Sequence, residues 1–489
     1  MIWAFLAGAA AVLGFSPLDF FPATLAALAV LVHLWMRAPS PGAACRLGFF
    51  FGLGLYGAGV SWVYVSLHRF GAMPMPLAAA ATLGFCAFLA LFPALAGWLQ
   101  ARIARDAESP EALRAVLLIP AAWMLMEWPL SWFLTGFPWL ALGYTAIDDP
   151  LSGYAPVGGV YAVSLALAVA AGLLWCIVLG NVRYTRWIAT GALVLVLACG
   201  YGLRAREWTT PVGEPLRVAL LQGNVPQEMK FDPARYARTL DAYARLAEGS
   251  DARLIVLPET AVPRFLDLVE PSFIERLKAA AVRNGGDLLL GIPMRDAAGG
   301  YLNSVISLGV SPSVRYDKVH LVPFGEFVPP GFGWIVRVLS IPLADFSLGA
   351  TDQRPMAVAG QRVALNVCYE DAYGAEIIRQ LPEATLLVNV SNVAWFGDSL
   401  APAQHLQIAR MRALETGRVY LTAANTGITA AIWPDASVRA QMKQFVQGQV
   451  EVDVRGYSGA TPYVRFGDWP AVLLALLALG FVALRRRSR

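Results

Sequence analysis

Apolar residues lie in long runs at the two ends of the chain and in short segments between them. Eight runs are long and nearly free of charge, and they cover residues 2–15, 23–36, 47–66, 76–99, 115–134, 158–179, 187–203 and 469–484. A helix of about 20 apolar residues crosses a hydrocarbon core of roughly 30 Å. The first run is short enough for a signal peptide, but no small-residue cleavage site follows it and a second run comes at once. We therefore expect eight transmembrane helices.

Residues 207–466 alternate short apolar segments with amphipathic ones. The short segments predict strands at 215–224, 253–259, 287–292, 302–309, 314–322, 362–368, 385–391, 419–424, 428–433 and 447–454. The amphipathic segments predict helices at 233–249, 270–284 and 404–416. This order is typical of a layered α/β sandwich. We expect a membrane domain of seven helices at 1–206, an α/β domain at 207–466, and a last membrane helix with a basic tail at 467–489.

Arginines follow every second apolar run and so predict an orientation. They are Arg37, Arg46, Arg102, Arg105, Arg114, Arg183, Arg186, Arg485, Arg486, Arg487 and Arg489. Eight spans place all of them on one side, with both termini in the cytoplasm. Arg204 and Arg206 fall on the other side, but four loops outnumber them. The α/β domain is then expected outside the cytoplasm, in the periplasm of a bacterium with two membranes.

Composition agrees with a membrane protein and argues against other classes. Hydrophobic residues make up 57% of the chain and charged residues 15%, and the net charge is only +4. Because the arginines lie mainly beside the apolar runs, nucleic-acid binding is not indicated. The five cysteines lack metal-ligand spacing, and only one falls in the α/β region, so neither a disulfide framework nor a zinc site is expected. Nothing indicates an organic cofactor.

Two further features have open interpretations. Glu127 lies within an apolar run, where a carboxylate is costly and suggests a function; the alternative is an interfacial residue at a frayed helix end. The loop at 324–346 is rich in aromatic and apolar residues. It is either a lid that dips into lipid or a flap packed on the core.

Three reactive side chains each follow an apolar strand. Cys368 ends the segment 362–368, Glu259 ends 253–259, and Lys318 lies within 314–322. A lone buried cysteine is more often a core residue than a nucleophile. A thiol attacks an acyl carbon as the thiolate, however, and a nearby carboxylate can take its proton while an ammonium group stabilises the oxyanion. Glu, Lys and Cys on three strand ends therefore predict a nucleophilic acyl-transfer site.

The motifs around these residues carry a resemblance to a known family. LPET (257–260), YDKVHLVPFGEFVP (316–329) and NVCYED (366–371) resemble the Glu-Lys-Cys triad of the nitrilase, or carbon–nitrogen hydrolase, superfamily. Seven further stretches resemble the apolipoprotein N-acyltransferase family: GFSPLDFFP, SWVYVSLHRFG, TGFPW, QGNVPQ, SNVAWFGDS, PAQHLQIARMRALE and NTGIT. The resemblance covers nearly the whole chain and implies eight spans joined to one nitrilase-like αββα sandwich.

The resemblance implies a ping-pong acyl transfer without a metal or cofactor. Cys368 would take an acyl chain from a membrane phospholipid, typically phosphatidylethanolamine, and pass it to the α-amino group of the S-diacylglyceryl cysteine of a lipoprotein. Glu259 would be the general base and Lys318 would support the oxyanion. The remaining implied residues are Glu326 and Glu370 as supporting carboxylates, and Phe231, Tyr369 and Trp395 at the substrate pocket or its lid. Val393 and Phe231 depart from the family pattern, which usually has Asp and Trp there, and the segment 127–132 lacks the arginine that is common in the family.

Two alternatives belong to other classes. A membrane-tethered amidase would use the same triad with water in place of the lipoprotein amine. Apolar lid loops and the membrane setting of the site favour the acyltransferase, since a small polar amide needs neither. A transporter with a regulatory domain would carry several paired polar groups in its spans, and these spans are nearly pure apolar apart from Glu127.

Overall fold

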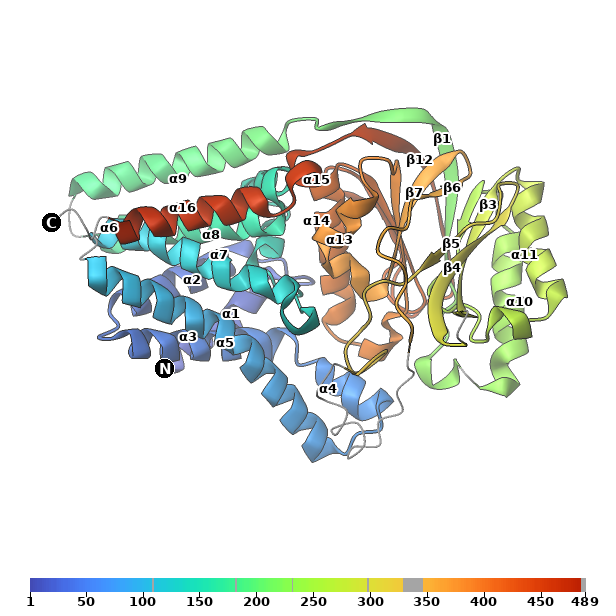
Figure 1. Cartoon of the computed structure of the whole chain (residues 1–489), viewed down its shortest axis with the longest axis horizontal. Helices are drawn as coiled ribbons and strands as arrows, with labels where there is room; N and C mark the ends of the chain where they lie inside the picture. Colours follow the sequence, from blue (N-terminus) through green and yellow to red (C-terminus); the bar gives the residue numbers. More distant parts are fainter. Residues whose placement is uncertain (108–109, 181–182, 231, 297–298, 329–345, 485–489) are drawn as a thin grey trace. The chain divides into compact units, whose positions relative to one another are not determined.

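The computed structural model describes residues 1–107, 110–180, 183–230, 232–296, 299–328 and 346–484. Contacts within the chain divide it into two units. The helical unit comprises Met1–Tyr64, Pro74–Glu207 and Thr461–Arg489. The sandwich unit comprises Val65–Met73 and Trp208–Ala460. Figure 1 shows that helices alone make up the first unit, whereas strands gather in the second.

The sandwich unit is built on two six-stranded sheets. One has the order β12-β1-β2-β3-β4-β5, with β1 Thr209–Gln222, β2 Leu254–Val256, β3 Asp287–Arg295, β4 Tyr301–Gly309, β5 Arg315–Asp317 and β12 Gly448–Gly459. The other has the order β11-β10-β9-β8-β7-β6, with β6 Met356–Val358, β7 Gln361–Val367, β8 Leu386–Ser391, β9 Val419–Ala424, β10 Ala430–Ile432 and β11 Val438–Gln441. Strands β1, β2 and β3 run parallel, as do β7, β8 and β9.

Alternating side chains of these strands fill two separate cores. On β1, Leu216, Val218 and Leu220 join residues of both sheets in a core between the sheets, while Ala219 and Leu221 face a core with two helices. The strand period of two residues produces this division. The helices are α10 Pro233–Glu248 and α11 Pro271–Arg283 over the first sheet. Helix α14, Ala401–Thr416, contacts β9 and β10 of the second sheet. The layers are therefore helix, sheet, sheet and helix, as Figure 1 shows.

The structure corrects the predicted strands at two places. The segment 314–322 is a strand only to Asp317, because the N–H groups of Val319 and His320 donate to the Glu370 carboxylate instead of to a neighbouring strand. The segment 253–259 likewise ends as a strand at Val256, so Glu259 lies beyond the strand. The short strands β6 and β11 were not predicted from the sequence, since neither has a long apolar segment.

The helical unit contains eight apolar segments, but their lengths differ from those predicted. Four helical segments are long and apolar enough to cross a membrane: Met75–Ala107, Glu111–Ser131, Pro150–Leu179 and Tyr184–Arg204. A bent pair, Pro41–Gly59 and Val63–Phe70 at 57°, gives a fifth if it is one span. The shorter apolar helices are Ile2–Gly14, Phe21–Met36 and Trp469–Leu484. Among the described residues the structure thus supports four or five spans by length and composition, and not the full eight.

Individual elements explain these lengths. The main helices of this unit are α1 Ile2–Ala11, α2 Phe21–Met36, α3 Pro41–Gly59, α5 Met75–Ala107, α7 Ile119–Glu127, α8 Ala155–Leu179, α9 Arg183–Arg204, α15 Pro462–Phe466 and α16 Trp469–Leu484. The predicted helix at 115–134 stops being α-helical at Glu127 and continues as a tight 3-10 turn, Trp128–Ser131, before Leu134 adopts a positive φ of 50°. Pro129 and the glycine at 136 favour this break.

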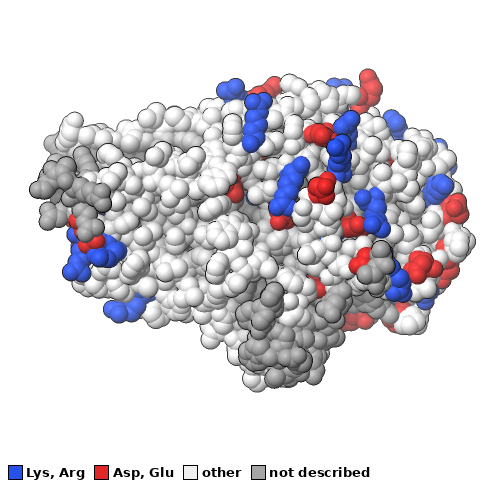
Figure 2. Space-filling view, viewed as in Figure 1, with Lys and Arg blue, Asp and Glu red and all other residues white. Residues whose placement is uncertain are grey.

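Small residues let the first helices of this unit approach closely. A side chain on Gly48 of α3 would collide with the Pro93 carbonyl of α5, and one on Gly54 would collide with the Phe5 carbonyl of α1. Such contacts are typical of helix pairs in lipid, where dispersion rather than the hydrophobic effect drives association. Figure 2 shows that the visible surface of the helical unit is almost free of charge except at one end, whereas charged side chains are spread over the sandwich unit.

A short segment between two apolar helices belongs to the sandwich unit. Ser66 donates its hydroxyl to the Trp395 carbonyl at 2.8 Å, the Phe70 ring meets the Trp395 ring edge-on at 6.0 Å, and Arg69 pairs with Glu228 at 3.0 Å. These contacts fasten residues 65–73 to two loops, one carrying Glu228 and the other carrying Trp395.

Candidate active site

The backbone at Cys368 is held in a strained conformation directly after β7. Cys368 has φ +54° and begins a 3-10 turn, Cys368–Ala372. The left-handed region costs a non-glycine residue about 1–2 kcal/mol. The Cys368 carbonyl accepts hydrogen bonds from Asn389 Nδ2 at 3.1 Å and from His405 Nε2 at 3.3 Å, and these bonds offset the strain. The sharp turn presents the thiol at the end of the strand.

The Glu259 carboxylate lies buried between the two sheets at the same edge. Its Oε1 accepts from Asn303 Nδ2 at 2.7 Å, and its Oε2 accepts from the Asn392 backbone N–H at 2.8 Å. The Cys368 thiol lies near enough that it and Glu259 influence each other's pKa. Asn303 lies on β4 of one sheet and Asn392 follows β8 of the other. Glu259 therefore joins the ends of both sheets.

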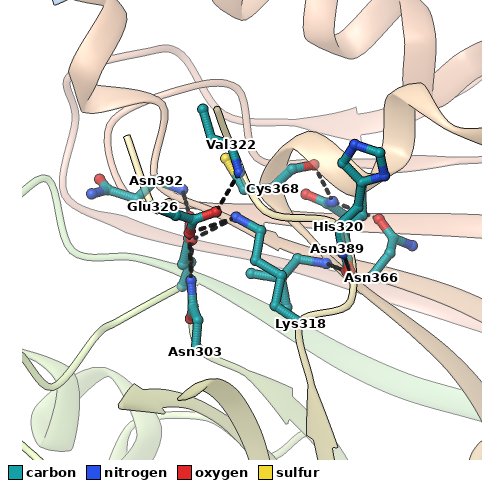
Figure 3. Close-up of polar contacts among 12 residues, drawn as sticks. Asn303, Lys318, His320, Val322, Glu326, Asn366, Cys368, Asn389 and Asn392 are labelled. Atoms are coloured by element: carbon teal, nitrogen blue, oxygen red, sulfur yellow. Dashed lines mark hydrogen bonds and ion pairs between the residues drawn. The ribbon is translucent and has the colours of Figure 1, made fainter. Parts of the chain in front are cut away.

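Lys318 is the buried cation of the site. Its side chain is 1% exposed, and its Nζ lies 2.8 Å from Glu326 Oε1 and 3.6 Å from Glu259 Oε1. Figure 3 shows the Lys318 ammonium group next to the Glu326 carboxylate, with Cys368 nearby. The structure thus brings Glu259, Lys318 and Cys368 together, as predicted from the strand ends.

These contacts determine the charge states at rest. Burial raises the pKa of the Cys368 thiol, and the Glu259 charge raises it further. Burial alone would also raise the pKa of Glu259, but Lys318, Lys230 and the hydrogen bond from Asn303 outweigh it and lower the value. Burial lowers the pKa of Lys318, yet Glu326 and Glu259 outweigh burial and raise it. The resting site therefore holds a neutral thiol beside an ionised carboxylate and an ammonium group.

Glu326 contacts Lys318 directly and is linked to Glu259 through Asn303. Its Oε1 accepts from Lys318 Nζ and from Asn303 Nδ2 at 3.2 Å, while its Oε2 accepts from the Val322 N–H at 2.8 Å. Figure 3 shows these bonds around the ammonium group. Glu326 thereby fixes the position of Lys318 relative to Glu259.

Glu370 braces the backbone on both sides of the site. Its Oε1 accepts from the N–H groups of Val319 and His320 at 2.6 and 3.0 Å. Its Oε2 accepts from the Val367 N–H at 2.6 Å and from the Tyr316 hydroxyl at 3.0 Å. Burial raises the pKa of Glu370 to about 7 despite these donors. Glu370 thus connects the loop after Lys318 to the residue before Cys368.

The predicted substrate-binding residues lie in three different settings. The Tyr369 ring is buried against His320 and Tyr373, with centroids 5.9 and 5.1 Å away. Trp395 is 42% exposed and packs on Phe70. Phe231 lies outside the described residues, and so does most of the loop predicted as a lid or flap, at 329–345.

Several residues of the site were not predicted from the sequence. Asn303 and Asn392 donate to Glu259, and the buried Asp371 holds His405 at 3.0 Å behind the Cys368 carbonyl. Burial lowers the pKa of His405, but Asp371 outweighs it, so the value is raised. Lys230 is also buried beside Glu259. Asn303 and Asn392 could have been proposed from the sequence because each is a polar residue at the end of a predicted strand.

The arrangement supports nucleophilic catalysis by a thiol. A carboxylate near a thiol can take its proton, and the ammonium group can stabilise an oxyanion in a low-dielectric site. Among the described residues, no three histidine, cysteine or carboxylate side chains gather in a way that would hold a metal ion.

Comparisons with known proteins find relatives of both the N-terminal part and the α/β part of the chain. Residues 7–173 match the apolipoprotein N-acyltransferase N-terminal domain, and residues 217–463 match carbon-nitrogen hydrolase. The chain is 48% identical to an apolipoprotein N-acyltransferase from Nitrosomonas europaea, over 99% of this chain and 96% of that protein. It is 45% identical to one from Ralstonia nicotianae, over 99% and 93%. A solved carbon-nitrogen hydrolase from Helicobacter pylori G27 matches 49% of this chain and 89% of its own, with 17% identity and a TM-score of 0.37.

Proposed function

The chain belongs to the apolipoprotein N-acyltransferase family, and from this premise we propose how its residues transfer an acyl chain. The enzyme moves a fatty acyl chain from a membrane phospholipid to the N-terminal amine of a lipoprotein. We assign the covalent step to Cys368, proton transfer to Glu259 and oxyanion support to Lys318. The observation that carries this assignment is the buried ion pair of Glu259 with Lys318 at 3.6 Å, whose charges both act on the Cys368 thiol.

In the first half-reaction the thiol gives its proton to Glu259 while its sulfur attacks the ester carbonyl carbon of the phospholipid. The carbonyl oxygen becomes an oxyanion, which the Lys318 ammonium group stabilises. Collapse of this intermediate breaks the ester C–O bond. Glu259 returns the proton to the departing alkoxide, so a lysophospholipid leaves and an acyl thioester remains on Cys368.

In the second half-reaction the α-amino group of the lipoprotein cysteine attacks the thioester carbon. Glu259 accepts one proton from this nitrogen, and the C–S bond breaks as the amide forms. The proton then passes to the Cys368 sulfur and restores the neutral thiol. No proton is gained or lost over the complete cycle when the amine enters in its neutral form.

Supporting roles follow from the contacts around the triad. Glu326 positions Lys318, and Glu370 positions the loop after Lys318 and the end of β7. Trp395, Tyr369 and Phe231 are assigned to substrate contact on the family resemblance.

We also propose the membrane arrangement predicted from the sequence. The four longer spans, the bent pair taken as a fifth, and the three shorter apolar helices together make eight crossings. Arginine placement supports cytoplasmic termini and a periplasmic α/β domain at 207–466, between a membrane domain at 1–206 and a last helix with its basic tail at 467–489. A bacterial inner membrane rich in phosphatidylethanolamine would then supply that lipid as acyl donor.

Intact mass of the purified protein tests the covalent step. After incubation with phosphatidylethanolamine in detergent, we expect the mass of the wild type to rise by one acyl chain, and a diacylglyceryl peptide to discharge it. Cys368→Ala should show no gain, whereas Cys199→Ala, at an exposed cysteine, should behave as the wild type. Absence of an acyl gain in the wild type, or transfer by Cys368→Ser, would overturn the assignment. Release of free fatty acid in place of peptide acylation would identify a hydrolase.

A further inference from the structure

A second lysine lies buried in the site and has no part in the acyl-transfer steps above. Lys230 is 5% exposed, at the end of a loop whose 3-10 turn, Gln227–Met229, follows β1. Its Nζ donates to the main-chain carbonyl of Glu259 at 3.2 Å. The loop itself is fixed to the site, because Gln227 Oε1 accepts from Asn392 Nδ2 at 2.8 Å. Lys230 is thus held in place beside the general base.

Lysine is rare in this chain, which makes two buried lysines at one site notable. The sequence has only four, and the remaining 34 of the 38 basic residues are arginines. Lys278 lies exposed on α11 and Lys443 is exposed too, whereas Lys230 and Lys318 are buried beside Glu259. A lysine ammonium group is a compact point charge, which fits beside a buried carboxylate without the fixed fork geometry of arginine.

Lys230 also lacks the direct ion pair that normally accompanies a buried charge. Among the described residues, the shortest ion pairs of the site join Lys318 to Glu326 and Glu259, and none within 4 Å involves Lys230. Burial lowers the pKa of Lys230 to about 8, while the charges of Glu259 and Cys368 act in the opposite direction. Below pH 8 the group is therefore mostly an ammonium ion that acts on Glu259 through space and through its carbonyl.

Charge balance indicates what this cation does. Glu259 and Glu326 are two buried carboxylates that share Lys318. With Lys230 the site holds two carboxylates and two ammonium groups. Without Lys230, the two carboxylates and Lys318 would carry a net charge of about −1, and protonation of one carboxylate would neutralise it. Among the influences that lower the pKa of Glu259, Lys230 ranks after Lys318 and ahead of the hydrogen bond from Asn303.

We propose that Lys230 is a positioning residue that keeps the Glu259 carboxylate ionised and thereby sets the lower pH limit of acyl transfer. This inference rests on the roles proposed above for Glu259 and Cys368. The direction follows from the charge: removal of a nearby cation makes Glu259 easier to protonate, and a protonated Glu259 cannot accept the thiol proton. The rate should therefore decline at a higher pH than in the wild type.

Other titratable groups face Glu259 and must remain unchanged in the test. They are Lys318, Glu326, Cys368, Tyr301 and His405. Substitution at Lys230 leaves all of them in place, so a change in pH dependence reports on Lys230.

The experiment is the rate of acyl-thioester formation on full-length protein, followed by intact mass between pH 5 and pH 9. The variants are Lys230→Met and Lys230→Gln, which remove the charge, Lys230→Arg, which keeps it, and Lys278→Met as an exposed control. A nearby charge shifts a carboxyl pKa by about 1–3 units. For the two uncharged variants we expect the ratio of the rate at pH 5 to the rate at pH 8 to fall about threefold or more. We expect Lys230→Arg and Lys278→Met to keep the wild-type ratio.

The remaining outcomes separate this inference from the proposed function. An equal loss of rate at every pH, or an unchanged ratio in variants with wild-type thermal unfolding, would show a merely structural lysine and overturn the inference. Failure of both uncharged variants to fold would do the same, because the ammonium group would then be needed for folding. A wild type that forms no thioester at any pH would instead contradict the proposed function.

Discussion

The two units each bury a glutamate, and the neighbours of these carboxylates differ. Glu259 in the sandwich unit is 7% exposed, with Lys318 at 3.6 Å, Lys230 at its carbonyl and the Cys368 thiol near enough for its pKa to respond to the Glu259 charge. Glu127 in the helical unit is 5% exposed. Its Oε1 accepts from the Leu142 N–H at 2.9 Å and from Trp123 Nε1 at 3.2 Å, and among the described residues no basic side chain lies within 4 Å of it.

This difference in neighbours indicates a catalytic role for Glu259 and a structural role for Glu127. A buried carboxylate needs compensation for lost hydration, and either cations or neutral donors provide it. The cations Lys318 and Lys230 lower the pKa of Glu259, which in the proposed mechanism leaves it ionised to accept the thiol proton. Neutral donors from a broken helix make Glu127 a link between the end of α7 and the 3-10 segment Leu142–Ala146. Glu127 lies at the end of α7, as one of its two interpretations expected, but it is buried.

The largest effect is expected at Glu259. Glu259→Gln removes the base and places an amide group next to donors, so acyl-thioester formation should fall by about 10³-fold, within the range typical of general-base catalysis. Single-turnover intact mass measures it. Glu275→Gln, at an exposed position on α11, is the matched control and should keep the wild-type rate. A Glu259→Gln rate within tenfold of the wild type would show that Glu259 is not the base.

The catalytic triad and the layers of the sandwich unit could be predicted from the sequence. Glu259, Lys318 and Cys368 each follow an apolar segment, and this pattern, with the resemblance to the nitrilase triad, predicted one shared site, although β2 and β5 belong to one sheet and β7 to the other. The alternation on β1 and the apolar helix faces likewise predicted the layers. Such regular patterns are visible because each one repeats along a single element.

The parts that escaped prediction depend on single contacts between distant residues. Asn392 reaches Glu259 across 133 positions, and Ser66 reaches Trp395 across 329. Neither contact has a periodic signature, so nothing in the sequence placed residues 65–73 in the sandwich unit. The strand predicted at 314–322 was too long for the same reason. Glu370, some 50 positions away, takes the N–H groups that a strand would have used.

A smaller effect with a defined pH dependence is expected at Glu370. This carboxylate has backbone donors and no cation in contact among the described residues. The effect of replacing it is therefore expected to be intermediate between the effects at Glu259 and at Glu127. Glu370→Gln turns part of the carboxylate into a donor, shifts the loop after Lys318, and should lower the thioester rate by roughly 10- to 100-fold. Intact mass at pH 7 measures this.

Thermal unfolding of the same variant tests the protonation of Glu370. Its pKa is about 7 when folded and 4.5 as the ordinary value, so between these pH values the folded state holds a proton that the unfolded state has lost. Stability should therefore fall as pH rises from 4.5 to 7, by at most about 3 kcal/mol, and level off above 7. Glu370→Gln should remove this contribution. An unchanged pH profile of the unfolding midpoint would show that Glu370 is ionised throughout.

The smallest effect on acyl transfer is expected at Glu127. Glu127→Gln retains an oxygen that accepts from the Leu142 N–H and from Trp123, so both the thioester rate and the unfolding midpoint should stay close to the wild type. Glu127→Ala leaves these donors without an acceptor in a buried setting, which costs about 1–3 kcal/mol and should lower the midpoint by a few degrees. A loss of rate above tenfold in Glu127→Gln, with unfolding unchanged, would contradict the comparison, since the charge of Glu127 would then matter for the reaction. An equal midpoint for the Gln and Ala variants would show that the link between α7 and the 3-10 segment carries little of the stability.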